Sequence, residues 1–326
     1  MELVTHKKLY LVAGRASRPL AEAVATELGE SLGEPNIAEF ANGEIHCRFS
    51  ESIRGCDAFI IQTHCHSEGM SINDTLMEQL IMVDAARRAS AKRITVVCPH
   101  YGYARQDRKA SGREPITAKL VANLFKEAGA SRLVGIDLHS GQIQGFFDGP
   151  VDHLTAMPVL VDRLRLLEGD LAIVSPDAGR VKVAERYANQ LDADLAIVHK
   201  RRSHTAFNTV EAKEVVGEVE GKVCVIVDDM IDTAGTVCAA AEQLAERGAS
   251  RVIAATTHGV FSGPALERLS ASPIEKVIVT DTVPLPDGAD LDLVEVLSVA
   301  PIIARAIDAV FEDASVSEIF GGDNLS

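Results

Sequence analysis

Short apolar runs rich in β-branched residues alternate along the chain with longer segments whose apolar residues follow a helical period. A short apolar run bounded by turn residues is typical of a strand buried on both faces of a parallel sheet. The runs predict strands at residues 9–13, 58–62, 94–98, 172–174, 195–199, 223–227, 273–280 and 293–299. The periodic segments predict helices at residues 19–28, 74–89, 237–246 and 302–311. This alternation favours an α/β fold with mostly parallel sheets flanked by helices.

The most informative stretch of the chain is residues 223–236. It begins as a predicted strand, has Asp228 and Asp229 at the strand's carboxyl end, and continues through a loop of small and hydroxylated residues into a predicted helix. Ligands of open parallel sheets bind beyond the carboxyl ends of the strands. The free N–H groups and the dipole at a helix start favour a bound phosphate. The loop therefore predicts a phosphate site.

The side chains of this loop indicate what kind of phosphate it would bind. Ala234 and Gly235 are small enough for an anion to approach the backbone, and Thr233 and Thr236 offer hydroxyl donors. The two preceding aspartates repel phosphate, but they can accept hydrogen bonds from a sugar diol or ligate a hard cation. The stretch suits a ribose 5-phosphate. A tight acidic turn capped by Asp232 and Thr233 is the alternative.

Composition limits the possible functions. The chain has 326 residues, of which 47% are hydrophobic, and this favours two compact α/β domains of about 150 residues each. A net charge of −15 argues against a basic surface for nucleic acid. No apolar run is long enough to span a bilayer, no signal-peptide pattern opens the chain, and the six cysteines show no paired spacing. We therefore expect a soluble cytoplasmic protein without a membrane partner.

An internal repeat links the two halves of the chain. Residues 129–139 recur as residues 248–258, with five identical positions and an offset of 119 residues. The preceding helices align at the same offset, which places Thr117 on Thr236. We interpret the chain as two copies of one α/β unit, with chance similarity as the alternative. The second copy has the phosphate loop, whereas the first has residues 113–117 at the aligned position.

The first copy carries a cationic loop instead, which follows the strand predicted at 94–98. In this loop Arg105 can bind phosphate oxygens in a planar, bidentate manner, and Gln106 can contact a base. A solvated charged loop is the alternative. Further upstream, Asn42 and Gly43 are a strong tight-turn signal, and a hairpin tip is the favoured interpretation.

Other segments offer candidate metal or catalytic groups. His139 is expected to close a strand with Asp137 on the same face, and such a pair can hold a divalent cation. Asp177 also follows a predicted strand. The histidines at 64–66 do not predict a zinc site, because consecutive side chains on a strand point to opposite faces. The three cations at 200–202 suggest a closing arm, with a solvated basic tip as the alternative.

Together these segments resemble the class I ribose-phosphate diphosphokinases, also called phosphoribosyl diphosphate synthetases, over nearly the whole chain. Residues 223–236 resemble a phosphoribosyl-diphosphate-binding motif that these enzymes share with type I phosphoribosyltransferases. Residues 137–152 match a signature that a plain phosphoribosyltransferase lacks. Residues 103–107 and 175–177 and the arm at 200–202 resemble features of the synthetases.

The resemblance implies two tandem phosphoribosyltransferase-type I-like domains. Residues 8–152 would form the ATP side, residues 153–300 the ribose 5-phosphate side, and residues 301–326 a helix and tail. The implied enzyme transfers the diphosphoryl group of ATP to the 1-hydroxyl of ribose 5-phosphate, which gives phosphoribosyl diphosphate and AMP for nucleotide biosynthesis. It would use Mg²⁺ and form a homo-oligomer, usually a hexamer in this family.

The resemblance also assigns roles to matching residues. The ATP-binding residues would be Asn42, Gly43, Glu44, Arg105 and Gln106, the first three supplied by a neighbouring subunit. The ribose 5-phosphate-binding residues would be Arg202, Asp228, Asp232, Thr233, Ala234, Gly235 and Thr236. The metal ligands would be His139 and Asp177, with Asp137, Asp148 and Asp152 as weaker candidates. Lys200 would stabilise the transition state. Many members have Asp at position 42 and Gly at position 234, so this chain departs from the family there.

Two other functions compete with this one. A phosphoribosyltransferase would consume the same product, but the cationic loop at 99–113 and the His139 signature disfavour it. A non-catalytic regulatory subunit of the synthetase would carry a damaged arm or phosphate loop, whereas Lys200, Arg202 and residues 232–236 are intact here.

Overall fold

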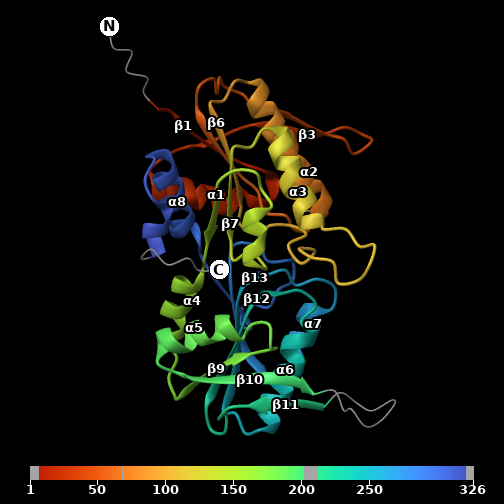
Figure 1. Cartoon of the computed structure of the whole chain (residues 1–326), viewed down its shortest axis with the longest axis vertical. Helices are drawn as coiled ribbons and strands as arrows, with labels where there is room; N and C mark the ends of the chain where they lie inside the picture. Colours follow the sequence, from red (N-terminus) through yellow and green to blue (C-terminus); the bar gives the residue numbers. More distant parts are fainter. Residues whose placement is uncertain (1–6, 68, 202–211, 321–326) are drawn as a thin grey trace. The chain divides into compact units, whose positions relative to one another are not determined.

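The apolar runs pair as strands of two sheets, one in each of two units of the chain (Figure 1). The computed structural model describes residues 7–67, 69–201 and 212–320. Unit 1 comprises Met1–Thr155, Thr282–Pro284 and Ser298–Ser326, and unit 2 comprises Ala156–Asp281 and Leu285–Leu297. Residues 301–320 thus group with the N-terminal unit.

The sheet of unit 1 is entirely parallel. Its strands, in spatial order, are β2 (Leu32–Gly33), β1 (Leu9–Ala13), β5 (Asp57–Ile61), β6 (Arg93–Cys98), β7 (Arg132–Ile136) and β8 (Val151–Leu154). The loops that follow these strands therefore share one edge of the sheet. The chain proceeds outward from β1 to β2 and, in the other direction, from β5 to β8, so the topological switch point lies between β1 and β5.

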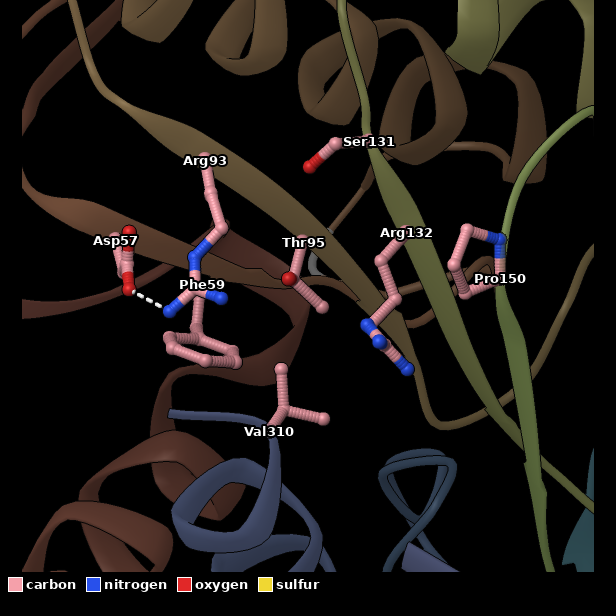
Figure 2. Close-up of a pocket in the computed structure, with 8 residues that line it drawn as sticks. All are labelled: Asp57, Phe59, Arg93, Thr95, Ser131, Arg132, Pro150 and Val310. Carbon is pink, nitrogen blue, oxygen red and sulfur yellow. Dashed lines mark hydrogen bonds and ion pairs between the residues drawn. The ribbon is translucent and has the colours of Figure 1, made fainter. Parts of the chain in front are cut away.

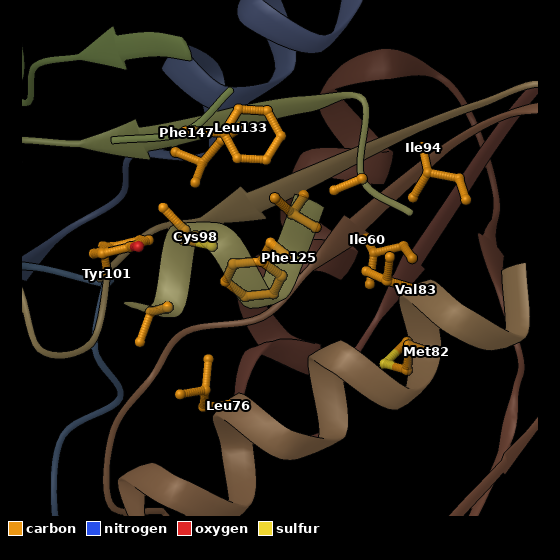
Figure 3. Close-up of a cluster of buried hydrophobic side chains, with 14 of the residues drawn as sticks. Ile60, Leu76, Met82, Val83, Ile94, Cys98, Tyr101, Phe125, Leu133 and Phe147 are labelled. Carbon is orange, nitrogen blue, oxygen red and sulfur yellow. The ribbon is translucent and has the colours of Figure 1, made fainter. Parts of the chain in front are cut away.

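Helices cover both faces of this sheet. The pair α1 (Arg18–Leu28) and α8 (Ala300–Phe311) packs on one face, and the pair α2 (Ile72–Arg88) and α3 (Thr117–Ala128) on the other (Figure 1). Figure 3 shows the core beneath α2 and α3, where Met82, Val83 and Phe125 meet Ile60 of β5, all fully buried. Because strand residues are buried on both faces, the strands appear in the sequence as continuous apolar runs.

A capping box sets the start of α2. The Ser71 hydroxyl accepts the N–H of Asp74, and the Asp74 carboxylate accepts the N–H of Ser71 at 2.7 Å. These bonds satisfy backbone donors that a helix start leaves without partners. The helix therefore begins at Ile72, two residues before the predicted start.

The sheet of unit 2 is parallel except at one end, where β10 and β11 pair antiparallel. Its strands, in spatial order, are β11 (Ala212–Val216), β10 (Asp194–Arg201), β9 (Leu171–Ser175), β12 (Val223–Ile231), β13 (Arg251–Gly259), β14 (Ile274–Thr280) and β15 (Val294–Leu297). Its helices are α4 (Met157–Leu164), α5 (Val181–Leu191), α6 (Gly235–Glu246) and α7 (Ala265–Ser270). From β9 the chain moves to β10, and from β12 it moves the other way to β13, so the switch point lies between β9 and β12.

The remaining elements are small. A two-stranded antiparallel hairpin consists of β3 (Asn36–Glu39) and β4 (Ile45–Arg48). Three short 3₁₀ helices are η1 (Arg15–Ser17), η2 (Gly141–Gly145) and η3 (Val316–Phe320). Within the described ranges, none of the helices combines the length and the apolar character needed to cross a membrane.

Candidate functional site

The acidic pair of unit 2 lies within β12. This strand pairs with β9 only as far as Ile226, whereas its pairing with β13 continues to Ile231. The two aspartates thus lie in the carboxyl-terminal part of the strand, as predicted, and the strand continues past them because one neighbouring strand stops earlier than the other. On the side where β9 has ended, the two residues border the switch point, where open parallel sheets bind ligands.

Arg180, in the loop between β9 and α5, pairs with both carboxylates. Its Nε lies 3.2 Å from Oδ1 of Asp228, and its Nη2 lies 2.7 Å from Oδ2 of Asp229. The backbone N–H of Asp229 also donates to Oδ1 of Asp228 at 2.8 Å. Burial and the neighbouring charge of Asp229 raise the pKa of Asp228, and Arg180 opposes that rise. Each carboxyl oxygen has two lone pairs, so Asp228 can accept a hydrogen bond from a ligand beside that from Arg180.

Asp177 organises the loop that carries Arg180. Its Oδ1 accepts the N–H groups of Gly179 at 2.7 Å and of Arg180 at 3.2 Å, and its carbonyl accepts the Ser175 hydroxyl at 2.6 Å. The Asp177 side chain is exposed, and no described residue donates a hydrogen bond to its Oδ2. Oδ1 of Asp177 thus stabilises the loop through hydrogen bonds, whereas Oδ2 accepts no hydrogen bond from the described part of the chain.

The loop between β12 and α6 is built to receive an anion. Ala234 is the N-cap of α6 and has a left-handed backbone with φ 60°. The N-cap residue itself has no polar side chain with which to cap the helix. Arg268 fixes the loop from α7 by donating from Nη1 to the carbonyl of Thr233 at 2.9 Å. The first N–H groups of α6 can therefore bind a phosphate.

In unit 1, the cationic loop follows β6 and ends at α3. Both backbone polar groups of Gln106 are hydrogen-bonded. Its N–H donates to the carbonyl of Tyr103 at 2.9 Å, and its carbonyl accepts the N–H of Ala118 at 3.2 Å. Its side-chain Oε1 accepts the hydroxyl of Thr117 at 2.5 Å. Arg105, directly before it, is exposed. The loop thus has a fixed backbone and presents an arginine to solvent.

The segment with Asn42 and Gly43 is the tip of the β3–β4 hairpin, as predicted. The tip is closed by bonds between Phe40 and Glu44 (2.9 Å) and between Gly43 and Phe40 (2.8 Å). Gly43 has φ 87°, which favours glycine, and Oδ1 of Asn42 accepts the N–H of Glu44 at 3.2 Å. All these residues are exposed.

The predicted place of His139 was wrong. β7 ends at Ile136, and Asp137 has a left-handed φ of 38°, so the strand alternation that would put Asp137 and His139 on one face is lost. Both residues lie in the loop after β7, and His139 is half-buried. Asp152 pairs with Arg132 at 2.6 Å, which does not favour a metal at Asp152. Across the described ranges, no three His, Cys, Asp or Glu side chains gather to hold a metal.

Two predicted residues belong to the basic run at 200–202. Lys200 is part of β10 and pairs in register with Lys213, but only its backbone is described. Arg202 lies outside the described residues. The expected roles of both stay predictions.

A cavity of about 170 Å³ in unit 1 is not an anion site, although two arginines line it (Figure 2). It lies where β5, β6 and β7 begin, at the edge opposite the loops described above. Arg93 pairs with Asp57 and, at 2.6 Å, with Asp313, and Arg132 pairs with Asp152. The carboxylates already neutralise both guanidinium groups.

Comparisons with known proteins identify the family models and proteins that this chain resembles. A model of the N-terminal domain of ribose phosphate pyrophosphokinase matches residues 9–129, and a model of the phosphoribosyl synthetase-associated domain matches residues 211–321. A ribose-phosphate pyrophosphokinase of Streptomyces avermitilis is 55% identical over 316 residues, which is 96% of each chain. One from Corynebacterium efficiens is 54% identical over 321 residues, or 98% of this chain and 97% of that one.

A solved structure agrees with these matches. The crystal structure of phosphoribosylpyrophosphate synthetase from Mycobacterium smegmatis is similar with a TM-score of 0.88 and 50% identity, covering 94% of this chain and 100% of that one. This confirms the predicted α/β fold with two phosphoribosyltransferase-type domains. The resemblance drawn from the motifs is confirmed as well, and the chain belongs to the ribose-phosphate pyrophosphokinase family.

Proposed function

We propose that this protein transfers the diphosphoryl group of ATP to the 1-hydroxyl of ribose 5-phosphate and releases AMP. Family membership supports the reaction. The observation that carries it in this chain is the switch point of unit 2, where Asp228 and Asp229 in β12 are followed by a short loop and the start of α6. Carboxylates that accept from hydroxyl groups next to N–H groups that bind phosphate match the two ends of one sugar phosphate.

Ribose 5-phosphate binds in unit 2. Its phosphate accepts the N–H groups at the start of α6 and the hydroxyls of Thr233 and Thr236. Asp228 accepts hydrogen bonds from the ribose hydroxyls while its carboxylate also pairs with Arg180. The neighbouring Thr256 hydroxyl in β13 is buried and has no hydrogen-bond partner among the described residues, so this edge has room for a further polar contact. Residues 232–236 and Arg202 complete the proposed set.

ATP binds with unit 1. Arg105 contacts the phosphates and Gln106 the nucleotide, while residues 42–44 of a neighbouring subunit's hairpin contact the adenine. This requires a homo-oligomer, which we propose to be a hexamer. An exposed apolar stripe along α3, consisting of its N-cap Ile116 and of Leu120 and Leu124, supports association because such side chains are normally covered.

Transfer of the diphosphoryl group depends on neutralising and positioning charge. Lys200 stabilises the charge that develops in the transition state.

We propose Mg²⁺ as the metal, with His139 and Asp177 as its protein ligands. Mg²⁺ keeps several waters and binds through few carboxylates plus substrate phosphates, so it does not need a cluster of three protein side chains. The Oδ2 atom of Asp177 fits such a role. When bound, the metal neutralises charge on the transferred phosphates.

The proposed compartment is the cytoplasm. All six cysteines, Cys47, Cys56, Cys65, Cys98, Cys224 and Cys238, are free thiols. Unpaired thiols are usual in reducing compartments.

The decisive experiment mixes the purified protein with ATP, Mg²⁺ and ribose 5-phosphate and measures AMP and phosphoribosyl diphosphate. We expect both products in equal amounts, and none when ribose 5-phosphate is omitted. Absence of AMP from the complete mixture would refute the proposal. Activity without any added subunit excludes a regulatory role, and failure to couple phosphoribosyl diphosphate to free nucleobases excludes a phosphoribosyltransferase.

Asp228→Asn should raise KM for ribose 5-phosphate, whereas the matched Asp308→Asn in α8 should not.

A further inference from the structure

His64 lies in the loop after β5, next to the cationic loop, and its side chain is fully buried. Its ring stacks on Phe125 of α3 with centroids 5.8 Å apart and planes 15° apart. Tyr101 approaches the ring edge-on at 6.1 Å. A buried polar ring needs hydrogen-bond partners for both nitrogens, because leaving one unmet costs about 1–3 kcal/mol.

Both ring nitrogens of His64 have partners, and these partners fix its tautomer. Gln79 of α2 donates from Nε2 to the carbonyls of Ile60 (2.9 Å) and Val97 (3.3 Å), so its Oε1 is the acceptor for His64 Nε2 at 2.8 Å. His64 Nε2 therefore carries the proton. Its Nδ1 is then the acceptor for the N–H of Gly102 at 2.9 Å. Burial lowers the pKa of His64 to about 4, which keeps the ring neutral near neutral pH.

The bond from Gly102 holds the cationic loop three residues before Arg105. The contact is close: a Cβ atom at Gly102 would lie 2.9 Å from Cβ of His64. The same stretch is anchored by His100, whose N–H donates to Thr63 Oγ1 at 3.0 Å. Of these anchors, the one at His64 connects the loop through Gln79 to two strands of the sheet.

We propose that His64 is a positioning residue for nucleotide binding: its Nδ1 accepts the Gly102 N–H and so sets the backbone that presents Arg105 and Gln106. The inference rests on the proposed function, in which these two residues contact ATP. His64 itself touches no substrate. A residue that only fills the core would matter for stability alone, whereas a positioning residue affects KM for one substrate.

Two substitutions separate the two hydrogen bonds of the ring. His64→Asn puts an amide oxygen where Nδ1 was, so it keeps the acceptor for Gly102 and loses the bond to Gln79. His64→Gln puts an amide nitrogen where Nε2 was, so it keeps the bond to Gln79 and loses the acceptor for Gly102. Both variants lose the ring that stacks on Phe125, so their losses of packing are matched.

Steady-state kinetics of the full-length protein test the proposal. We expect His64→Gln to raise KM for ATP about tenfold, the effect of an unmet buried donor, and to leave KM for ribose 5-phosphate unchanged. His64→Asn should keep KM for ATP near that of the wild type, although both variants unfold at a lower temperature. An equal rise in both variants, or equal effects on the two substrates, would show that His64 is only a packing residue.

A second variant covers the case in which both substitutions prevent folding. Gly102→Ala keeps His64 but forces the loop away from it, and we expect the same selective rise in KM for ATP. An unchanged KM for ATP in folded Gly102→Ala would overturn the proposal. Failure of the reaction assignment has a different signature, because the wild-type protein would then form no AMP at all.

Discussion

Removing Arg180 should destabilise unit 2 in a way that depends on pH. Arg180→Met removes the guanidinium group that lies 2.7 Å from Asp229 and 3.2 Å from Asp228, so the two adjacent carboxylates lose this neutralising charge. The matched control is Lys182→Met in α5, which removes the same charge from an exposed position without an ion pair in the described part of the chain.

The size of the effect follows from burial. Breaking a buried ion pair by removing one partner costs about 3–5 kcal/mol. Asp229 is 9% exposed, so its pair with Arg180 belongs in this range. The side chain of Asp228 is 26% exposed, so solvent screens its pair, which adds at most about 1 kcal/mol. We expect Arg180→Met to lose about 3 kcal/mol of unfolding free energy when both carboxylates are ionised, and Lys182→Met to lose less than about 0.5 kcal/mol.

The pH dependence has a definite sign. The pKa of Asp228 is already raised by burial and by Asp229, and Arg180 is what lowers it. Without Arg180 the pKa rises further. A carboxyl whose pKa is raised on folding contributes stability below its unfolded pKa of about 4 and loses it as the pH rises through the folded value. Because the folded pKa of Asp228 is about 8 with Arg180 present, the part of the deficit that comes from Asp228 should be small at acid pH and grow as the pH rises above about 8.

Urea unfolding followed by circular dichroism at several pH values measures this deficit. The double variant Arg180→Met/Asp229→Asn should recover much of the loss at high pH, because it removes one of the two adjacent negative charges. Our reasoning would be refuted by a deficit that is constant between pH 4 and pH 9, or by purely additive effects in the double variant.

Four further predictions concern other parts of the chain. Phe125→Ala should cost about 3–5 kcal/mol because Phe125 is fully buried, and Leu124→Ala, at a position 41% exposed, should cost far less in the same urea assay. Lys200→Ala should lower kcat by orders of magnitude and leave ribose 5-phosphate affinity unchanged in a binding titration. Ala234→Gly should change stability by no more than about 1 kcal/mol, whereas Ala234→Val, strained at φ 60°, should raise KM for ribose 5-phosphate. Lys7 and Arg93 lower the pKa of Asp313 to about 2, so the stability contribution of Asp313 should disappear as the pH falls from about 4 towards 2, and Asp313→Asn should abolish this acid-range change in melting temperature.

The buried strands could be predicted from the sequence because burial on both faces leaves a simple pattern. The strand predicted at 9–13 is β1 with the same bounds, and β6 differs from its prediction by one residue. The predicted helix starts were less accurate where a capping side chain or the preceding loop determines the first helical residue. α2 begins at its Ser71 cap, and α6 begins two residues before the predicted helix, directly after the left-handed Ala234.

The candidate site was predictable only in part, because its geometry depends on residues that are distant in sequence. Local alternation placed His139 on a strand, but Asp137 turns left-handed and ends the pattern. The role of Arg180 depends on β9 lying beside β12, and that of His64 depends on Gln79 and Gly102 being brought to it by α2 and β6. The local signal for Arg180 was a cation three residues after Asp177, in the loop that follows a predicted strand.

One difference explains why the repeat has a phosphate loop in only one copy. The starts of α3 and α6 occupy equivalent places, since Thr117 aligns with Thr236. At α3, the carbonyl of Gln106 already accepts the N–H of Ala118, and the Thr117 hydroxyl donates to the Gln106 side chain. At α6, the N-cap residue is Ala234, which has no polar side chain. The longer cationic loop of unit 1 therefore occupies its own helix start, and in the proposed function it would bind an anion through arginine side chains. The short loop of unit 2 would instead offer backbone N–H groups to a phosphate. The same α/β unit would then provide two different anion sites for the two phosphorylated substrates of the proposed reaction.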